Sequence, residues 1–154
     1  MKKAISIIIP VIVCFLTGYT AQFFQAEAIE HWYPLLNKPT LTPPNIAFPI
    51  AWSILYLFMG ISIGLIIASE SRRKRFFMVL FILQLILNFT WSISFFYLQN
   101  PLLALINIIL LEVILIYYAI ATFKEFKISS ILFIPYILWV GFATYLNLYI
   151  LFYN

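Results

Sequence analysis

The sequence predicts an all-α integral membrane protein built from five transmembrane helices. Five apolar stretches, each of about 20 residues or slightly more, occupy residues 4–24, 46–68, 76–98, 102–123 and 129–151. A helix rises about 1.5 Å per residue, so each stretch is long enough to cross a hydrocarbon core of about 30 Å. Hydrophobic residues make up 65% of the 154-residue chain, which leaves no room for a soluble catalytic domain. We therefore expect one membrane domain that covers residues 1–154.

The basic side chains predict how this bundle is oriented. The first gap between apolar stretches holds only Lys38 and the third gap holds none. The other basic residues precede the first stretch or fall in the second and fourth gaps: Lys2, Lys3, Arg72, Arg73, Lys74, Arg75, Lys124 and Lys127. The positive-inside rule then places the N-terminus in the cytoplasm and the C-terminus outside, in what we expect to be a bacterial plasma membrane. The net charge of +4 is assigned to loops that face anionic lipid, and no nucleic-acid partner is expected.

The first apolar stretch admits a second interpretation. Lys2 and Lys3 before an apolar run, with Ala26, Glu27 and Ala28 after it, also fit a cleaved signal peptide. The apolar run reaches residue 24, which is longer than a usual signal-peptide core. A retained first helix is therefore favoured.

The first gap, residues 26–45, is the only long loop expected. It contains Pro34, Pro39, Pro43 and Pro44, and prolines favour extended segments and turns over regular helix. The segment also carries several aromatic and leucine side chains, which makes it too apolar to lie free in water. We predict a folded lid over the outer mouth of the bundle.

Small and polar residues mark the helix faces that should point inward. In the first stretch such a stripe recurs at helical spacing: Gly18, Ala21, Gln22 and Gln25. In the second stretch Gly60 and Gly64 match the GxxxG pattern, which lets two helices approach closely. That close approach could occur within the bundle or between two copies of the chain.

Three further helix faces carry polar groups at membrane depth. The third stretch aligns Gln84, Asn88, Trp91 and Phe95, and the fifth aligns Tyr136, Trp139, Ala143, Leu146 and Asn147. The fifth-stretch pattern suits a pocket wall and also an ordinary aromatic contact between helices. Glu112, near the centre of the fourth stretch, is either a functional group or a protonated side chain that bonds to a neighbouring helix.

Several kinds of chemistry are excluded by composition. The sequence contains no Asp, one His (His31) and one Cys (Cys14), so a Ser-His-Asp triad and a zinc site are ruled out. No phosphate-binding loop is present, and we expect neither hydrolase, kinase nor metal-dependent activity. His31 could serve as an axial haem ligand or as an interfacial anchor. The 16 Phe, 10 Tyr and 4 Trp instead favour a cavity for a large, flat, apolar ligand.

Four motifs carry a family resemblance. The loop motif comprises Trp32, Tyr33, Leu36, Lys38, Pro39, Pro43 and Pro44, and the second-stretch motif comprises Pro49, Trp52, Leu55, Tyr56, Met59 and Gly60. The third-stretch motif comprises Gln84, Leu85, Leu87, Asn88, Trp91 and Ser92, and the fifth comprises Pro135, Tyr136, Trp139, Phe142, Ala143, Thr144, Leu146 and Asn147. In order and spacing they resemble the TspO/MBR family of tryptophan-rich sensory and translocator proteins, which includes the peripheral-type benzodiazepine receptor.

The resemblance implies a five-helix bundle, commonly a homodimer, with a ligand cavity open toward the first loop. Family members are similar in binding protoporphyrin IX, haem and isoquinoline or benzodiazepine-type drugs. The implied ligand-binding residues are Tyr33, Pro44, Trp52, Tyr56, Asn88, Trp91, Trp139, Ala143 and Asn147. The sterol pattern of animal members needs a basic residue after its tyrosine, and none follows Tyr149. No tightly bound cofactor is expected, because a porphyrin would be ligand or substrate.

Three functions follow from this resemblance. The first is porphyrin binding with light- and oxygen-dependent porphyrin degradation, in which Trp52 and Trp139 would be the catalytic redox partners. The second is transport of a porphyrin or another apolar metabolite. The third is a ligand-responsive membrane sensor.

Overall fold

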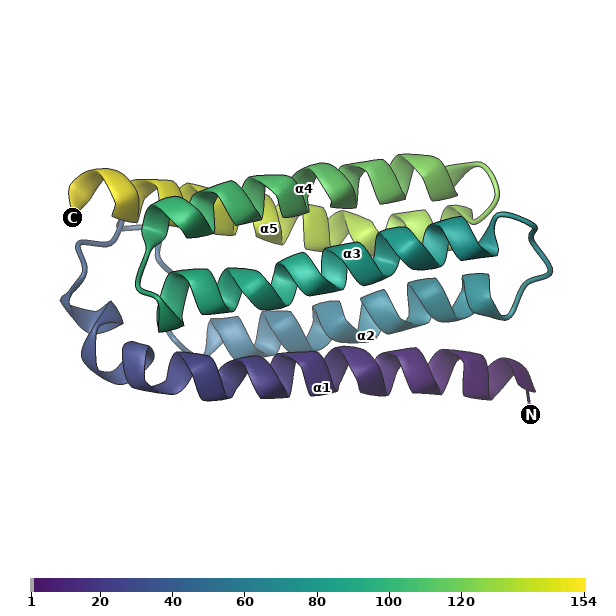
Figure 1. Ribbon diagram of the computed structural model, residues 1–154, viewed down its shortest axis with the longest axis horizontal. Coiled ribbons are helices and arrows are strands. Elements are labelled where there is room, and N and C mark those ends of the chain that lie inside the picture. The colour runs from purple at the N-terminus through teal and green to yellow at the C-terminus, as the bar shows by residue number, and fades with distance from the viewer. Residues whose placement is uncertain (1) are drawn as a thin grey trace.

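Five long helices run side by side along one axis in the computed structural model, which describes residues 2–154 (Figure 1). Their bounds are α1 Lys2–His31, α2 Ala47–Ile67, α3 Lys74–Ser92, α4 Pro101–Phe123 and α5 Lys127–Tyr153. Two short elements complete the described chain: the 3-10 helix η1, Tyr33–Leu35, and the π-helix η2, Ile93–Tyr97, which continues α3. All five long helices are long and apolar enough to span a membrane. The predicted all-α five-helix fold is confirmed.

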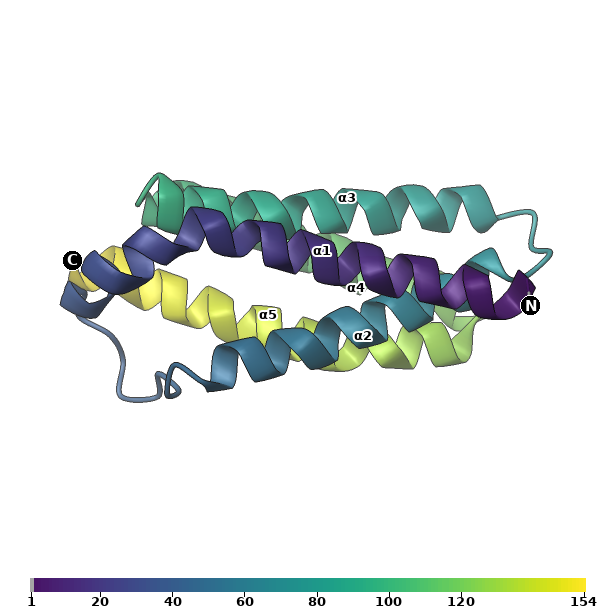
Figure 2. The same cartoon turned by 90° about the horizontal axis from the view of Figure 1, so that it is seen from below.

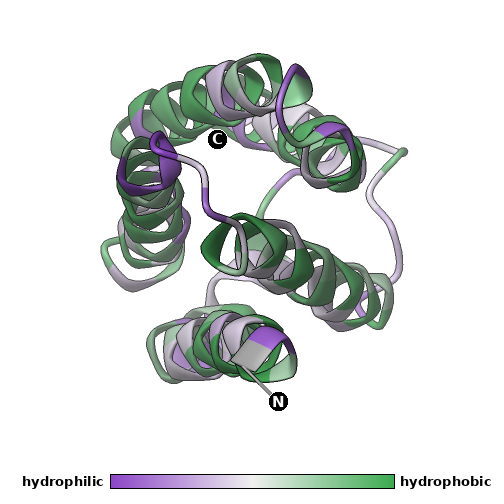
Figure 3. Ribbon diagram, turned by 90° about the vertical axis from the view of Figure 1, so that its right-hand side faces the viewer, coloured by the Kyte–Doolittle hydropathy of each residue, from purple (hydrophilic) through white to green (hydrophobic). Residues whose placement is uncertain are grey.

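The helices form a closed ring in the order α1, α2, α5, α4, α3. Each packs mainly on its two neighbours in this order, and α3 with η2 closes the ring against α1. In the end view of Figure 3 the helices are largely apolar and the polar residues gather in the connecting loops. This is the distribution expected of a bundle surrounded by lipid.

The two ends of the bundle differ in their connections. We call one the basic end: it holds the N-terminus, loop 68–73 and loop 124–126. We call the other the lid end: it holds loop 32–46, the connection from η2 to α4, and the C-terminus. Asn100 caps α4 at the lid end, because its side chain accepts a hydrogen bond from the backbone N–H of Leu103.

The loop prediction 26–45 is wrong at its N-terminal side. Helix α1 continues to His31, so the lid comprises residues 32–46. The reason is local: Gln, Ala and Glu dominate residues 25–30 and are good helix formers, while the first loop proline is Pro34. A hydropathy pattern does not detect this polar extension of an apolar helix.

The GxxxG pair packs within the chain. A Cβ atom added at Gly60 would meet the backbone of Val11, with the Val11 nitrogen 2.6 Å away. A Cβ atom at Gly64 would lie 2.6 Å from the Ile7 Cα atom. The two glycines therefore let the backbones of α1 and α2 touch near the basic end.

Candidate functional site: an aromatic cavity at the lid end

A cavity of about 500 Å³ lies between α1, α2, α3, η2 and α5 in the lid-end half of the bundle. Seven of the nine residues predicted to bind a ligand line it: Tyr33, Trp52, Tyr56, Asn88, Trp91, Ala143 and Asn147. None of the lining side chains carries a formal charge. The cavity is therefore an apolar and aromatic space with a few amides and hydroxyls, as expected for a small-molecule site.

At the floor of the cavity, the lining side chains of Tyr56 and Asn88 are hydrogen-bonded to each other and to the buried Tyr136. The Tyr56 hydroxyl donates to Asn88 Oδ1 at 3.3 Å, and Asn88 Nδ2 donates to the Tyr136 hydroxyl at 2.9 Å. Trp52 stacks on Tyr56 with ring centroids 5.6 Å apart. These contacts join α2, α3 and α5, and they hold the Trp52 and Tyr56 rings as one aromatic surface facing the cavity.

A second aromatic surface stands on α3 and η2. The Trp91 ring stacks on Phe95 at 5.4 Å, and its indole nitrogen donates to Asn147 Oδ1 at 3.2 Å. The amide of Asn147 in turn donates to the Pro101 carbonyl at 2.8 Å. Asn147 thus orients Trp91 and ties α5 to the start of α4. The wider turn of the π-helix also lets the neighbouring residues Phe95 and Phe96 both line the cavity.

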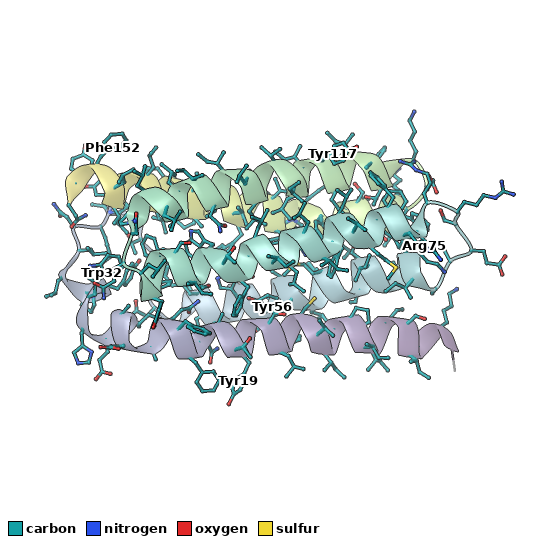
Figure 4. The ribbon with its side chains drawn as sticks, viewed as in Figure 1. Tyr19, Trp32, Tyr56, Arg75, Tyr117 and Phe152 are labelled. Atoms are coloured by element: carbon teal, nitrogen blue, oxygen red, sulfur yellow. The ribbon has the colours of Figure 1, made fainter. Side chains whose placement is uncertain are left out.

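Helix α1 supplies a wall that the site prediction did not include. Gly18 leaves room for the Tyr56 ring, because an added Cβ atom would lie 2.7 Å from Tyr56 Cζ. Figure 4 shows Tyr56 next to α1. Gln25 Nε2 donates to the Ser92 hydroxyl at 2.7 Å, which joins α1 to α3. The stripe of small and polar residues on the first apolar stretch was the signal that could have identified this wall.

Two predicted site residues do not line the cavity. The Trp139 ring packs edge-on against Phe48 at 5.9 Å, and it is Phe48 that faces the cavity. Pro44 lies exposed in the loop before α2, next to Asn45, which does line the cavity. Helical spacing placed Trp139 on the correct helix but could not show that a side chain of α2 would cover it.

The lid is folded by hydrogen bonds within itself. The Lys38 ammonium donates to the carbonyls of Tyr33 at 2.7 Å, Leu36 at 3.0 Å and Pro34 at 3.3 Å. It also lies 4.9 Å from the centroid of the Tyr33 ring, a cation–π distance. Burial raises the pKa of Tyr33, which lines the cavity as a neutral phenol.

The lid is also joined to the end of α5. The backbone N–H of Asn37 donates to Asn154 Oδ1 at 2.7 Å, and Asn154 Nδ2 donates to the Asn37 carbonyl at 3.2 Å. Trp32, labelled at this end in Figure 4, packs against Phe95 at 5.5 Å. The lid is therefore joined to the end of α5 by hydrogen bonds and to η2 by an aromatic contact.

Glu112 and His31 lie outside the cavity. Glu112 Oε2 is buried without a hydrogen-bond partner, and Oε1 lies 3.8 Å from the position of a Cβ atom added at Gly141. His31 ends α1 on the exposed surface, with Nδ1 at 3.2 Å from the Glu27 carbonyl. Within residues 2–154 no three His, Cys, Asp or Glu side chains come together as metal ligands.

The fold and the cavity together define an integral membrane protein whose helices enclose an aromatic chamber at one end. The chain belongs to the TspO/MBR family, whose model matches residues 9–153. The tryptophan-rich protein TspO of Chlorobaculum tepidum is 34% identical over 152 residues, 97% of this chain and 96% of the relative. The TspO of Archaeoglobus fulgidus is 40% identical over 134 residues, 84% of each chain. The translocator protein of Sus scrofa is 30% identical over 120 residues, 76% of this chain and 71% of the relative.

Proposed function

We propose that this protein binds a tetrapyrrole such as protoporphyrin IX or haem in the cavity and promotes its light- and oxygen-dependent degradation. The observation that carries the proposal is the pair of aromatic surfaces, Trp52 on Tyr56 and Trp91 on Phe95, in one cavity of about 500 Å³. That volume lies within the range of about 300–1,000 Å³ typical of small-molecule sites. Flat conjugated rings, including isoquinoline and benzodiazepine-type drugs, would gain stacking on both surfaces.

The uncharged lining predicts the pose of such a ligand. A porphyrin carboxylate placed deep in the cavity would lose its hydration without meeting a cation, at a high free-energy cost. Among the lining residues, polar groups of Gln22, Asn45 and Ser53 lie on exposed parts of the wall. The macrocycle would therefore lie inside the cavity with its carboxylates directed toward this exposed rim.

The photochemical part of the proposal assigns the main role to Trp52. A bound porphyrin absorbs light, and its excited state can react with dioxygen or take an electron from an adjacent indole. Trp52 lines the cavity and can contact the ligand directly. Trp139 would act through the intervening ring of Phe48, so its role as a redox partner should be the weaker one.

Binding is favoured over passage through the bundle. The basic-end half is filled by buried side chains, with Met59, Ile66 and Leu115 each fully buried. A pathway across the membrane would require this core to open. The cavity is a chamber in one half of the bundle, which suits a receptor or catalyst better than a channel.

The proposal includes the orientation of the protein in the membrane and its oligomeric state. From the positive-inside rule we expect the basic end in the cytoplasm and the lid end on the outer face, in what we expect to be a bacterial plasma membrane. The cavity would then take up ligands on the outer side. We also expect two copies to associate as a homodimer.

The test measures protoporphyrin IX absorbance and tryptophan fluorescence in the dark and under light, with the protein in lipid nanodiscs. Wild type is compared with Trp52→Phe, Trp139→Phe and the control Trp32→Phe, whose residue does not line the cavity. We expect saturable dark binding in every variant and the largest loss of photodegradation in Trp52→Phe. Absence of saturable dark binding by wild type would overturn the proposal. Binding without protein-dependent loss of absorbance would remove the catalytic part and leave a receptor.

A further inference from the structure

The cavity wall is buried on one side and exposed on the other. On α3 and α5 the lining residues Asn88 and Asn147 are 4% and 1% exposed. On α1 the lining residues Tyr19 and Ile29 are 59% and 41% exposed. On α2 the lining residue Ser53 is also exposed. A residue that both lines a cavity and is exposed stands at its edge, so the opening lies along α1 and α2 and reaches Asn45 at the end of the lid.

The packing of α1 explains why the bundle is open there. At the basic end α1 touches α2 through Gly60 and Gly64. Toward the lid end α1 is held by α3 and η2 instead: Phe24 packs on Phe89 at 5.8 Å and on Tyr97 at 5.7 Å. Figure 2 shows α1 and α2 close together near the N-terminus and diverging toward the lid end. Beyond the contact of Gly18 with Tyr56, the two helices form opposite edges of the cavity.

The rest of the lid, by contrast, is held in place. Lys38 holds three carbonyls of the lid itself, and Asn37 is bonded in both directions to Asn154 at the end of α5. Opening the lid for each ligand would break the two bonds between Asn37 and Asn154. Passage between α1 and α2 leaves the lid bonds intact. The hydroxyl of Ser53 does not join the two helices either, because it donates to the Pro49 carbonyl of its own helix.

We infer that the cavity is filled from the bilayer, through a lateral opening between α1 and α2 rimmed by Gln22 and Ser53, while the lid stays fastened. This inference rests on the proposed function. It narrows the ligand to an amphiphile that dissolves in the membrane, with a flat apolar body and a polar edge. The body would slide in at the level of the acyl chains, and the polar edge would remain with the amide and hydroxyl of the rim.

This route differs from the opening toward the first loop that the family resemblance implies. A water-soluble ligand would have to enter through the lid end, where the loop covers the cavity. A ligand already concentrated in the bilayer reaches the α1–α2 edge by lateral diffusion. The lid would then act as a fixed roof that keeps water out of the cavity.

The first arm of the test narrows the opening. Ser53→Phe adds a ring at the rim, and the matched control Ile54→Phe adds the same ring on the neighbouring exposed residue, which does not line the cavity. Protoporphyrin IX in nanodisc lipid is mixed with each protein, and tryptophan quenching gives the association and dissociation rates. We expect Ser53→Phe to slow association by about tenfold, a barrier increase of roughly 1.4 kcal/mol. The control should retain wild-type rates.

The second arm locks the lid. The double variant Asn37→Cys, Asn154→Cys replaces the bonded pair with a disulfide, and its reduced form is the internal control. Locking should leave both rates unchanged. Gln22→Phe, on the other edge of the opening, provides a second blocking variant should Ser53→Phe not fold.

The outcomes separate the two proposals. A lid disulfide that slows association, or rim variants that fold and keep wild-type rates, would overturn lateral access while leaving the binding function intact. If wild type shows no saturable binding, the proposed function fails, and lateral access fails with it. Slow rim variants together with an unaffected locked lid would establish the lateral route.

Discussion

The two halves of this bundle use the same residue types for opposite purposes. In the basic-end half, the space beside Gly60 and Gly64 is filled by the backbone of α1. In the lid-end half, the space beside Gly18 is filled by the ring of Tyr56, which is also the floor of the cavity. A backbone cannot move aside, whereas a side chain can turn. Close packing at one end therefore anchors α1, and the other end of α1 can stand apart from α2.

The polar contacts of the two halves differ in the same way. In the basic-end half, Ser62 donates to the Ser129 carbonyl and Ser129 donates to the Ser62 carbonyl, each at 2.9 Å. In the lid-end half, Tyr56, Asn88 and Tyr136 bond through side chains alone. Bonds to backbone fix the separation of two helices. Bonds between side chains can rearrange when a ligand arrives, so the Tyr56–Asn88–Tyr136 set can adapt while the Ser62–Ser129 contact stays fixed.

The largest loss of stability should come from a substitution that forces α1 and α2 apart where their backbones touch. Gly60→Val places a branched side chain against the Val11 backbone, and overpacking typically costs about 1–3 kcal/mol, occasionally more. We expect the upper part of that range or beyond it, because backbone atoms must move. Reversible unfolding in mixed micelles, followed by circular dichroism, measures the loss. Gly141→Ala is the control: its new methyl group meets the nearest atom at 3.8 Å and should change stability by no more than about 0.5 kcal/mol. Equal free energies of unfolding for Gly60→Val and Gly141→Ala would show that the basic-end half is not rigidly packed.

A smaller effect is expected from one substitution made in both halves. Ala119→Leu enlarges a buried residue of the packed core and should cost about 1–3 kcal/mol of stability. Ala143→Leu projects into the cavity and should cost far less stability while weakening porphyrin binding about tenfold, or roughly 1.4 kcal/mol. Unfolding and fluorescence titration of both variants separate the two results. The contrast between the two halves would be contradicted if Ala119→Leu caused no loss of stability or if Ala143→Leu left the porphyrin affinity unchanged.

The smallest effect concerns the connections at the two ends. At the basic end, hydrogen bonds from Ser71 and Arg73 to Glu125 hold the pKa of that carboxyl below its usual value. Because the folded-state pKa is depressed, the pair stabilises the loops above the ordinary carboxyl range, and the contribution is lost as pH falls through the folded-state pKa. The Asn37–Asn154 bonds at the lid end involve no titratable group.

Hydrogen exchange at neutral and acidic pH measures this difference. Acid should raise exchange in residues 68–73 and 124–126 more than in the lid, residues 32–46. Arg73→Gln should raise the pKa of Glu125 toward its ordinary value and produce part of the same change at neutral pH. Arg72→Gln is the matched control, since the ion pair is made by Arg73. If acid raised hydrogen exchange equally at the two ends, the stabilising role given to Glu125 would be contradicted.

The spans were predictable because hydropathy depends on composition over about 20 residues, and the solvent around a membrane helix is uniform. The ends of the helices were harder to predict from the sequence. Residues 25–30 form helix through local propensity. In the π-helix after Ser92, Phe95 and Phe96 pack on Trp32 and Tyr33, which are distant in sequence. Neither feature changes the mean hydropathy of its segment.

The cavity was predictable where one residue faces it directly and unpredictable where another residue intervenes. Asn88 and Trp91 lie one turn apart on α3, and both reach the cavity. Trp139 and Ala143 lie one turn apart on α5, and Phe48 covers the first while the second is open. Helical periodicity gives the direction of a side chain. It does not give the neighbour that stands in front.

The close contact of α1 with Gly60 and Gly64 also bears on assembly. A glycine pair of this spacing is often used to join two separate chains, yet here its groove already holds residues of the same molecule. A second copy could reach these glycines only by displacing the first helix. Any self-association of this chain must therefore use other surfaces, and substitutions on the outer faces of the helices are the ones to screen for an altered oligomer.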